Sequence, residues 1–433
     1  MRAIQPDRRS APSLIKTVAL KLSEPQKLSL DNGIPLFVFG NAIHPAIRLD
    51  IVFDAGSIWQ TKKLVASTTI KMLKEGTASF SGGTIASKVD YYGAYIDLQA
   101  SKDTAWISLY CLQKHLPKLL PLLKSMLTEA SFRTRDFKLK NKRQKQAFII
   151  NSQKPKQMAR MAFNKLIFGA DTAYGQAASE VDFDLLSNSD LIQYYQQQFH
   201  PDNAYMILSG AIGDSDIKLI NNELGSVWRE GGSKSMLPLD FDFQSGYHPV
   251  LREKALQSAI MIGRPLMLRQ HPDYIPFLLL NTLLGGYFGS RLMTNIREDK
   301  GYTYGINSQV MPMRHATSFA ISTETGTAVT QAALKEIQHE LKRLREETVS
   351  SDELELVKNY LNGSYLRALD GVFNQAERFR SVYDSGMNMQ FYKESLERIQ
   401  ATTADELKML AIKYLDPASM VTVVVGDELQ KPE

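Results

Sequence analysis

The feature that most constrains the fold is an internal duplication, because motifs of the first half recur in the second half in the same order. In the segments "FHPDNAYMILSG" (199–210) and "LDPASMVTVVVG" (415–426), a proline is followed by an apolar run and, nine residues on, a glycine. Three segment pairs carry the repeat, at offsets of 216, 217 and 209 residues: 199–210 with 415–426, 132–144 with 349–361, and 88–97 with 297–306. Similar order and near-constant offset predict two homologous structural units.

Each half contains an early strand, several helices and a closing strand, without the regular strand–helix alternation of a doubly wound fold. We therefore expect an α+β fold: two tandem halves, each an antiparallel sheet with helices packed on one face, together forming a clamshell. Glycine, serine, proline and charged residues concentrate in 229–249, which predicts a linker there. The predicted halves are then residues 1–228 and 250–433.

Composition narrows the class of protein. The apolar fraction of 44% is ordinary for a globular protein, and a net charge of +5 neither demands nor excludes a polyanionic partner. The single cysteine, Cys111, excludes an internal disulfide framework. The N-terminal "MRAIQPDRRSAPSLIKTVAL" has no apolar run typical of a signal peptide, and no apolar stretch is long enough for a membrane span. We expect a cytoplasmic protein, with a periplasmic location left open.

Common catalytic signatures are absent: no P-loop, G-x-G-x-x-G or G-x-S-x-G motif occurs. No histidine has another histidine within five positions, so no two-histidine helical metal site is predicted. The segment "HELKR", from His339, begins like a zinc helix but has Arg343 where a second histidine would stand.

A basic stretch between Lys138 and Arg160 has eight positive residues and no acidic one. Nucleic-acid binding is one interpretation, but only Phe148 supplies an aromatic side chain for stacking. We favour a solvated or cavity-lining helix face, and attraction of an acidic peptide or partner is an intermediate possibility. No nucleic-acid partner is expected.

The most unusual stretch is "GGYFGSRLMTNIREDKGYTYGINSQ" (285–309), in which Arg297 and Tyr304 lie seven residues apart across a turn. Considered alone, Arg297 is typical of a cation at a helix C-terminus. Tyr304 is typical of an aromatic side chain in the alternating pattern of a strand. The first half contains Lys88 and Tyr95 at the same spacing, which we interpret as a relic of the duplication.

The chain resembles the inverzincin peptidases, a family that includes pitrilysin, insulin-degrading enzyme and mitochondrial processing peptidase. The resemblance covers nearly the whole chain, from "LDNGIPLFVF" to the last strand, and the family shares the duplication. It is carried by "FDAGS", "LKEGT", "SGGTIASKVDYYGAYID", "FHPDNAYMILSG" and, most specifically, "LGGYFGSRLMTNIREDKGYTYGI". In relatives the last element presents an arginine and a tyrosine to the substrate, and the matching residues here are Arg297 and Tyr304.

The chain departs from the family at its zinc motif, H-x-x-E-H. The corresponding positions, counted back from "GT" at 76–77, hold Ser67, Ile70 and Lys71. The third ligand of the family is a glutamate further along, and no Asp or Glu occurs between residues 136 and 171. This chain is thus expected to bind no metal and no cofactor.

The resemblance implies a zinc-less subunit of a heterodimeric zinc metallopeptidase. The expected partner is a homologous subunit with an intact H-x-x-E-H, which holds the zinc, and the expected ligand is a peptide substrate. Arg297 and Tyr304 would then bind the substrate carbonyl and stabilise the oxyanion. The alternative is a catalytically silent scaffold or peptide-binding homologue of the family.

Overall fold

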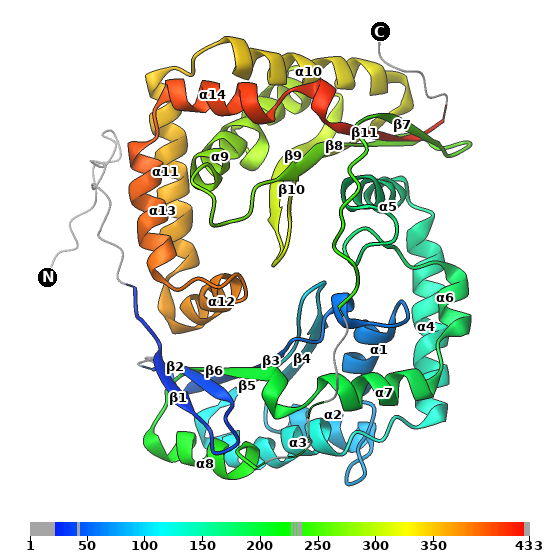
Figure 1. Cartoon of the computed structure of the whole chain (residues 1–433), viewed down its shortest axis with the longest axis vertical. Coiled ribbons are helices and arrows are strands. Elements are labelled where there is room, and N and C mark those ends of the chain that lie inside the picture. The colour runs from blue at the N-terminus through cyan, green and yellow to red at the C-terminus, as the bar shows by residue number, and fades with distance from the viewer. Residues whose placement is uncertain (1–21, 41–43, 227, 229–230, 232–235, 428–433) are drawn as a thin grey trace, which may run out of the picture.

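The computed structural model describes residues 22–40, 44–226, 228, 231 and 236–427. Residues 1–21 and most of 227–235 lie outside this part, so the signal-peptide prediction and residues 229–230 and 232–235 of the predicted linker fall beyond the described residues. Figure 1 shows two sheets, one in each half of the chain, with helices around both. The last residues of the predicted linker belong to the first strand of the second sheet, which begins at Gly246.

The first half builds a six-stranded sheet of order β1-β2-β6-β3-β5-β4. Its strands are β1 (Gln26–Ser29), β2 (Pro35–Phe39), β3 (Ala46–Phe53), β4 (Tyr95–Ala100), β5 (Ala105–Leu112) and β6 (Ala204–Gly210). Its α-helices are α1 (Val65–Met72), α2 (Gly82–Tyr91), α3 (Leu116–Thr128), α4 (Thr134–Ser152), α5 (Pro155–Phe168), α6 (Glu180–Leu185), α7 (Asn188–Gln198) and α8 (Asp214–Leu224).

The second half builds a five-stranded sheet of order β7-β11-β8-β10-β9. Its strands are β7 (Gly246–Leu251), β8 (Gln257–Leu266), β9 (Thr303–Pro312), β10 (Thr317–Gly326) and β11 (Val421–Gly426). Its helices are α9 (Tyr274–Asn281), the π-helices η4 (Thr282–Gly286) and η5 (Met293–Asp299), α10 (Thr330–Glu346), α11 (Ser351–Ala368), α12 (Gly371–Tyr383), α13 (Gln390–Ala401) and α14 (Ala404–Tyr414).

The predicted α+β class and the duplication are confirmed, with one refinement of the sheets. Both are antiparallel except for one parallel pair, β2 with β6 and β7 with β11. The closing strand of the first half, β6, lies between β2 and β3, and that of the second half, β11, lies between β7 and β8. Each is parallel to the earlier and antiparallel to the later of its two neighbours. The sequence predicts fully antiparallel sheets. It does not reveal the parallel pairs, because the position of a closing strand depends on long-range pairing, which local sequence does not encode.

Strand alternation gives each sheet two buried faces. In β3, Leu49 and Ile51 face a core shared with α1, α3 and α7, whereas Val52 faces the other way. In the second half, Phe319 and Ile321 of β10 face a core shared with α9 and α10. Each half therefore packs its helices against one face of its sheet, as predicted, and leaves the opposite face for other elements.

The opposite face of each sheet is partly covered by a helix from the other half. Helix α5 of the first half packs on β8 and β11, where Phe163 and Ile167 lie in one cluster with Met261 and Val423. Helix α12 of the second half packs in the same way on β2 and β6 (Figure 1). This reciprocal packing interlocks the two halves through apolar side chains.

The two contacts of this exchange differ in their chemistry. On the α12 side, the ring centroid of Phe379 lies 4.7 Å from that of Phe37 on β2, so the contact is aromatic. On the α5 side, Gly263 of β8 has no room for a side chain. A Cβ there would lie 1.9 Å from the carbonyl oxygen of Phe319 and 2.9 Å from Cζ of Phe163. Close packing of α5 on the second sheet therefore depends on this glycine.

Candidate functional site: a cavity lined by both halves

A cavity of about 1090 Å³ lies between helix α5 and strands β8, β9 and β10 of the second sheet. Its floor is formed by one face of β8, β10 and β9, and its wall by α5 and by residues 174–178. Odd-numbered residues of β9 line it: Thr303, Gly305, Asn307, Gln309 and Met311. The intervening Ile306 and Ser308 are buried on the opposite face, so strand alternation separates cavity from core.

Tyr304 is at the mouth of this cavity. It lines the cavity and is 95% exposed, so its ring is not used to pack the strand on which it lies. The preceding Gly301 has φ +65°, a left-handed conformation that lets the chain turn from η5 into β9. The turn thus delivers an unpacked tyrosine to the cavity.

Arg297 is held by a different contact. It is half-buried on η5, and its Cζ lies 4.7 Å from the ring centroid of Phe288. The same turn of η5 is also held by α10, because the Asn295 side chain donates hydrogen bonds to Glu336 (3.0 Å) and Glu340 (2.8 Å) of that helix. Arg297 is not among the residues that line the cavity, so the structure brings only Tyr304 of the predicted pair to its surface.

The three positions that correspond to the family's zinc motif lie on α1. Ile70 is fully buried in the core of the first half. The Ser67 hydroxyl donates to the carbonyl oxygen of Leu64 at 3.2 Å. Burial and the neighbouring charges of Lys140 and Lys74 lower the pKa of Lys71.

These residues do not fit a zinc ion. Zinc requires imidazole, thiolate or carboxylate donors, whereas α1 offers a hydroxyl, an alkyl chain and an amine. The neighbouring helix α4 approaches α1 through Gln144, whose Oε1 lies 3.4 Å from the Thr68 hydroxyl. Across the described residues no cluster of three His, Cys, Asp or Glu side chains is placed to hold a metal.

The cavity continues toward α1. A second cavity of about 340 Å³, lined by Ser67, also contacts Lys102 and residues 176–178, which line the larger cavity as well. Of the three motif positions, Ser67 therefore borders the smaller cavity, and Tyr304 borders the larger one, with which the smaller cavity shares lining residues. Their spacing in the sequence does not show that these two regions border neighbouring cavities.

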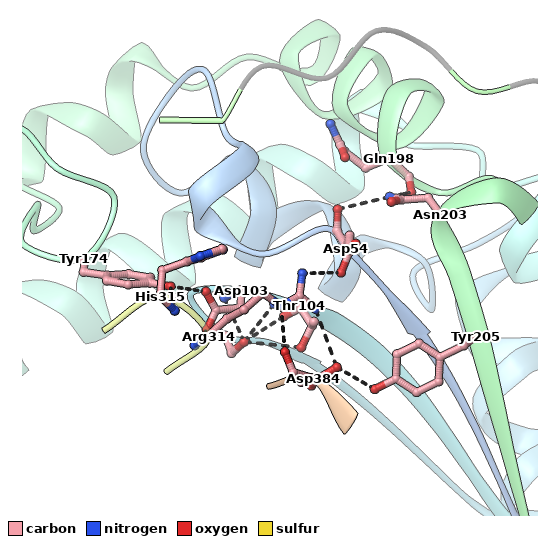
Figure 2. Close-up of polar contacts among 11 residues, drawn as sticks. Asp54, Asp103, Thr104, Tyr174, Gln198, Asn203, Tyr205, Arg314, His315 and Asp384 are labelled. Carbon is pink, nitrogen blue, oxygen red and sulfur yellow. Dashed lines mark hydrogen bonds and ion pairs between the residues drawn. The ribbon is translucent and has the colours of Figure 1, made fainter. Parts of the chain in front are cut away.

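A polar cluster that the sequence did not reveal joins the halves beside the cavity (Figure 2). Arg314, in the turn between β9 and β10, pairs with Asp54 of the first half at 2.8 Å, and its backbone N–H donates to Asp103 at 3.0 Å. Its Nε donates to the Asp384 carbonyl oxygen at 3.1 Å. The Tyr205 hydroxyl donates to the Asp384 carboxylate at 2.7 Å. Nothing in the sequence of this turn, "MPMRHAT", indicates that Arg314 would join the two halves.

Charge and burial compete in this cluster. Burial alone would lower the pKa of Arg314, but the carboxylates of Asp54, Asp384 and Asp103 outweigh it and raise that pKa. Burial raises the pKa of Asp384, and the hydrogen bond from Tyr205 offsets this only in part. The Tyr174 hydroxyl donates to Asp103, and burial together with that bond raises the tyrosine pKa. The cluster is a network of partly buried charges that bridges the two halves.

Two further observations concern membrane crossing and the single cysteine. Among the described residues, no helix combines the length and apolarity that crossing a membrane would need. Cys111 is buried in β5, and burial raises its pKa to about 11, so its thiol is poorly suited to act as a nucleophile.

Comparisons with known proteins agree with this architecture. The family model "Peptidase M16 inactive domain" matches residues 186–361. The chain is 22% identical over 404 residues to "Non-peptidase homolog YmxG" of Helicobacter pylori, covering 91% of this chain and 92% of the relative. It is also 22% identical over 357 residues to "Uncharacterized zinc protease YmxG" of Bacillus subtilis, covering 82% and 86%.

Among solved structures, the crystal structure of a peptidase M16 inactive domain from Pseudomonas fluorescens superposes with a TM-score of 0.84 at 24% identity. The match covers 94% of this chain and all of the other, so it extends over both halves and supports the clamshell fold. The duplication, the sheet topology and the matching family model lead to one assignment. The chain matches the peptidase M16, or pitrilysin-like, family, through that family's inactive-domain model over residues 186–361 and through its similarity to the YmxG relatives.

Proposed function

We propose that this chain is the zinc-less subunit of a heterodimeric zinc metallopeptidase, in which Arg297 and Tyr304 act on a peptide bound in a closed chamber. One observation carries the proposal. The arginine–tyrosine element is complete, and its tyrosine is free at the cavity mouth, whereas the metal positions on α1 hold no ligand. A chain that retains substrate-binding groups without a metal site is suited to complement a subunit that has one.

The chemistry of the pair fits carbonyl recognition. Arg297 is a permanent cation with several N–H donors. Its Cζ lies 4.7 Å from the ring centroid of Phe288, and this cation–π contact still leaves N–H groups that can donate hydrogen bonds to a ligand. Tyr304 adds one O–H donor. Both groups can stabilise negative charge that develops on a scissile carbonyl oxygen, a type of interaction that lowers the barrier to acyl transfer.

The metal would be held by the partner, a homologous chain with an intact H-x-x-E-H. Permanent interfaces of this kind usually bury about 2,000 Å² or more. The proposed boundaries of the halves, 1–228 and 250–433 with a linker at 229–249, and a cytoplasmic location belong to the same proposal.

The decisive experiment has three parts. Metal analysis of the chain purified alone should find far less than one zinc per molecule. Mixing with the H-x-x-E-H homologue of the same organism should yield a stable heterodimer in analytical ultracentrifugation. Peptide hydrolysis by that heterodimer should exceed the activity of either chain alone. A monomer in the mixture, or stoichiometric zinc on the isolated chain, would contradict the proposal.

A silent scaffold is the second candidate, favoured by the "non-peptidase" name of the Helicobacter pylori relative. It predicts association with a partner but no effect of Arg297 or Tyr304 on catalysis. The substitutions described in the Discussion separate the two functions.

A further inference from the structure

One wall of the larger cavity carries three cations. Lys156 and Arg160 lie on α5 four residues apart, and Lys102 lies in the turn between β4 and β5. Positions i and i+4 of a helix share a face, so α5 presents two like charges side by side. Such a pair is unfavourable in an isolated helix, which means that α5 gains nothing from it by itself.

Lys102 is close enough to respond to this charge. Burial lowers its pKa, Asp103 offsets part of that effect, and the nearby Arg160 lowers the pKa further. Its Nζ donates to the backbone carbonyl oxygens of Ala173 (3.1 Å) and Gln176 (3.5 Å) instead of to a carboxylate. The carboxylate on the lining is Glu324, on β10. The residues that the first half contributes to the cavity lining include these three cations and no carboxylate, and Asp103 offsets part of the charge of Lys102.

The floor of the cavity does not offer a free strand edge. Strand β9 ends the order of the second sheet and, within the described residues, pairs only with β10. The centre of its outer edge is covered, because the Ile306 N–H donates to Met293 Sδ at 3.5 Å and a Cβ on Gly285 of η4 would lie 2.7 Å from the Ser308 nitrogen. The floor therefore contributes side chains, among them Asn307 and Gln309, and a ligand would be recognised through its own side chains.

We infer that the cavity selects acidic peptides, whose carboxylate side chains would lie toward Lys102, Lys156 and Arg160. This inference rests on the proposed function, because it names the substrate class of the same chamber. It also gives a use to the acid-free segment between Asp136 and Asp171, whose C-terminal part forms the cationic face of α5.

The test is isothermal titration calorimetry on the full chain with three peptides of ten residues, the length of β9. The peptides share one sequence except at alternate positions, which hold Glu, Gln or Lys. We expect the Glu peptide to bind about five- to tenfold more tightly than the Gln peptide, and the Lys peptide to bind most weakly. The advantage of the Glu peptide should shrink as salt is raised.

Two double variants locate the effect. Lys156→Gln with Arg160→Gln should remove the preference for the Glu peptide. The matched control, Lys142→Gln with Arg143→Gln on α4, also removes one lysine and one arginine but from exposed positions outside the cavity lining, and should keep the preference. If the control variant loses the preference as well, net charge and not the cavity is responsible, and the inference is overturned.

Other outcomes separate this inference from the proposed function. Equal binding of all three peptides would overturn the charge selectivity and leave peptide binding intact. Binding of none of them would remove the support for a peptide chamber altogether. Tighter binding of an oligothymidylate than of the Glu peptide, abolished by the α5 variant, would assign the cations to a nucleic acid and overturn the peptide class.

Discussion

In the first half Lys88 lies over the ring of Phe80, with 4.5 Å between Nζ and the ring centroid. In the second half Arg297 lies over the ring of Phe288, with 4.7 Å between Cζ and the centroid. Each half thus has a cation over an aromatic ring, with the ring eight residues before the cation in the first half and nine before it in the second. The difference lies in the cation, because a guanidinium in a cation–π contact still presents several N–H groups, whereas an ammonium is a compact point charge.

The tyrosines that follow differ as well. Both lie on edge strands, after a glycine with positive φ (+59° at Gly93 and +65° at Gly301). Tyr95 is 61% exposed, and its ring lies 6.1 Å from that of Tyr110 on the neighbouring strand. Tyr304 is 95% exposed and borders the cavity. Both tyrosines are therefore exposed on equivalent strands, but Tyr95 keeps a ring contact with its neighbouring strand, whereas Tyr304 borders the cavity. The backbone was retained while the surroundings of the side chains diverged.

The largest expected effect comes from weakening the apolar packing between the two halves. Phe163→Ala on α5 and Phe379→Ala on α12 should each lower the free energy of unfolding by about 3–5 kcal/mol, because each removes a buried ring and leaves a cavity. Chemical denaturation measures the loss, and Leu256→Ala, at a residue that is 88% exposed, is the control. A loss below about 1 kcal/mol at either phenylalanine would show that this helix does not fasten the halves.

The second prediction concerns the two stacked cations. In the complex with the zinc-bearing homologue, Arg297→Ala should lower kcat by about 10²–10³-fold, whereas Lys88→Ala should leave kcat nearly unchanged. Arg297→Lys keeps the charge but loses the planar fork, so partial recovery is expected. Zinc content and assembly are measured beside kcat. Equal losses from the two alanine variants would mean that both cations serve only the fold.

The third prediction concerns the polar connection between the halves. Arg314→Met should cost about 1–3 kcal/mol of unfolding free energy, because Asp54 and Asp384 lose their donor while partly buried. Arg135→Met, an exposed arginine on α4, is the control. If the two variants unfold alike, the apolar interlock alone joins the halves.

The smallest expected effect distinguishes two carboxylates by pH. Burial would raise the pKa of Asp273, but hydrogen bonds from Lys413 and Tyr414 outweigh it and lower that pKa. Its stabilising contribution is therefore present above the unfolded-state pKa and lost as pH falls through the folded-state pKa. Asp384 has the opposite sign, because its raised pKa gives a contribution that is present at low pH and lost as pH rises.

The corresponding experiment is urea denaturation at neutral and acid pH. Asp273→Asn should cost about 1 kcal/mol at neutral pH and less at about pH 3, where the loss of the contribution has begun. Asp384→Asn should cost less than Asp273→Asn at neutral pH. The reverse order at neutral pH would show that the two environments have been assigned the wrong way round.

Sequence was sufficient for those parts of the fold that local patterns encode. The apolar run before the final glycine of the repeat pair 199–210 and 415–426 forms the closing strand of each half, β6 or β11, because its pattern is local. In the repeat pair 132–144 and 349–361 the helix starts differ: α4 begins after Arg133, whose side chain makes no capping bond. Ser350 does cap the equivalent helix α11.

The site was only partly predictable. Spacing and resemblance single out Tyr304 and the degenerate positions on α1, but they do not place Arg297 against Phe288. The polar cluster around Arg314 was missed because it joins side chains more than 200 residues apart in sequence, such as Asp103 and Arg314 with a separation of 211. The basic stretch was predicted to be a solvated or cavity-lining helix face, and α4 and α5 supply these two surfaces respectively.

The most direct test of the proposed division of labour compares the two tyrosines in the assembled complex. Tyr304→Phe and Tyr95→Phe delete the same hydroxyl from equivalent strands and keep both rings, so fold and assembly should survive in each. We expect Tyr304→Phe to lower kcat by about 10²-fold or more with little change in KM, because the hydroxyl acts on charge that develops in the transition state. Tyr95→Phe should leave kcat at the wild-type value. Wild-type kcat for Tyr304→Phe would contradict a catalytic contribution from this chain and favour the scaffold function.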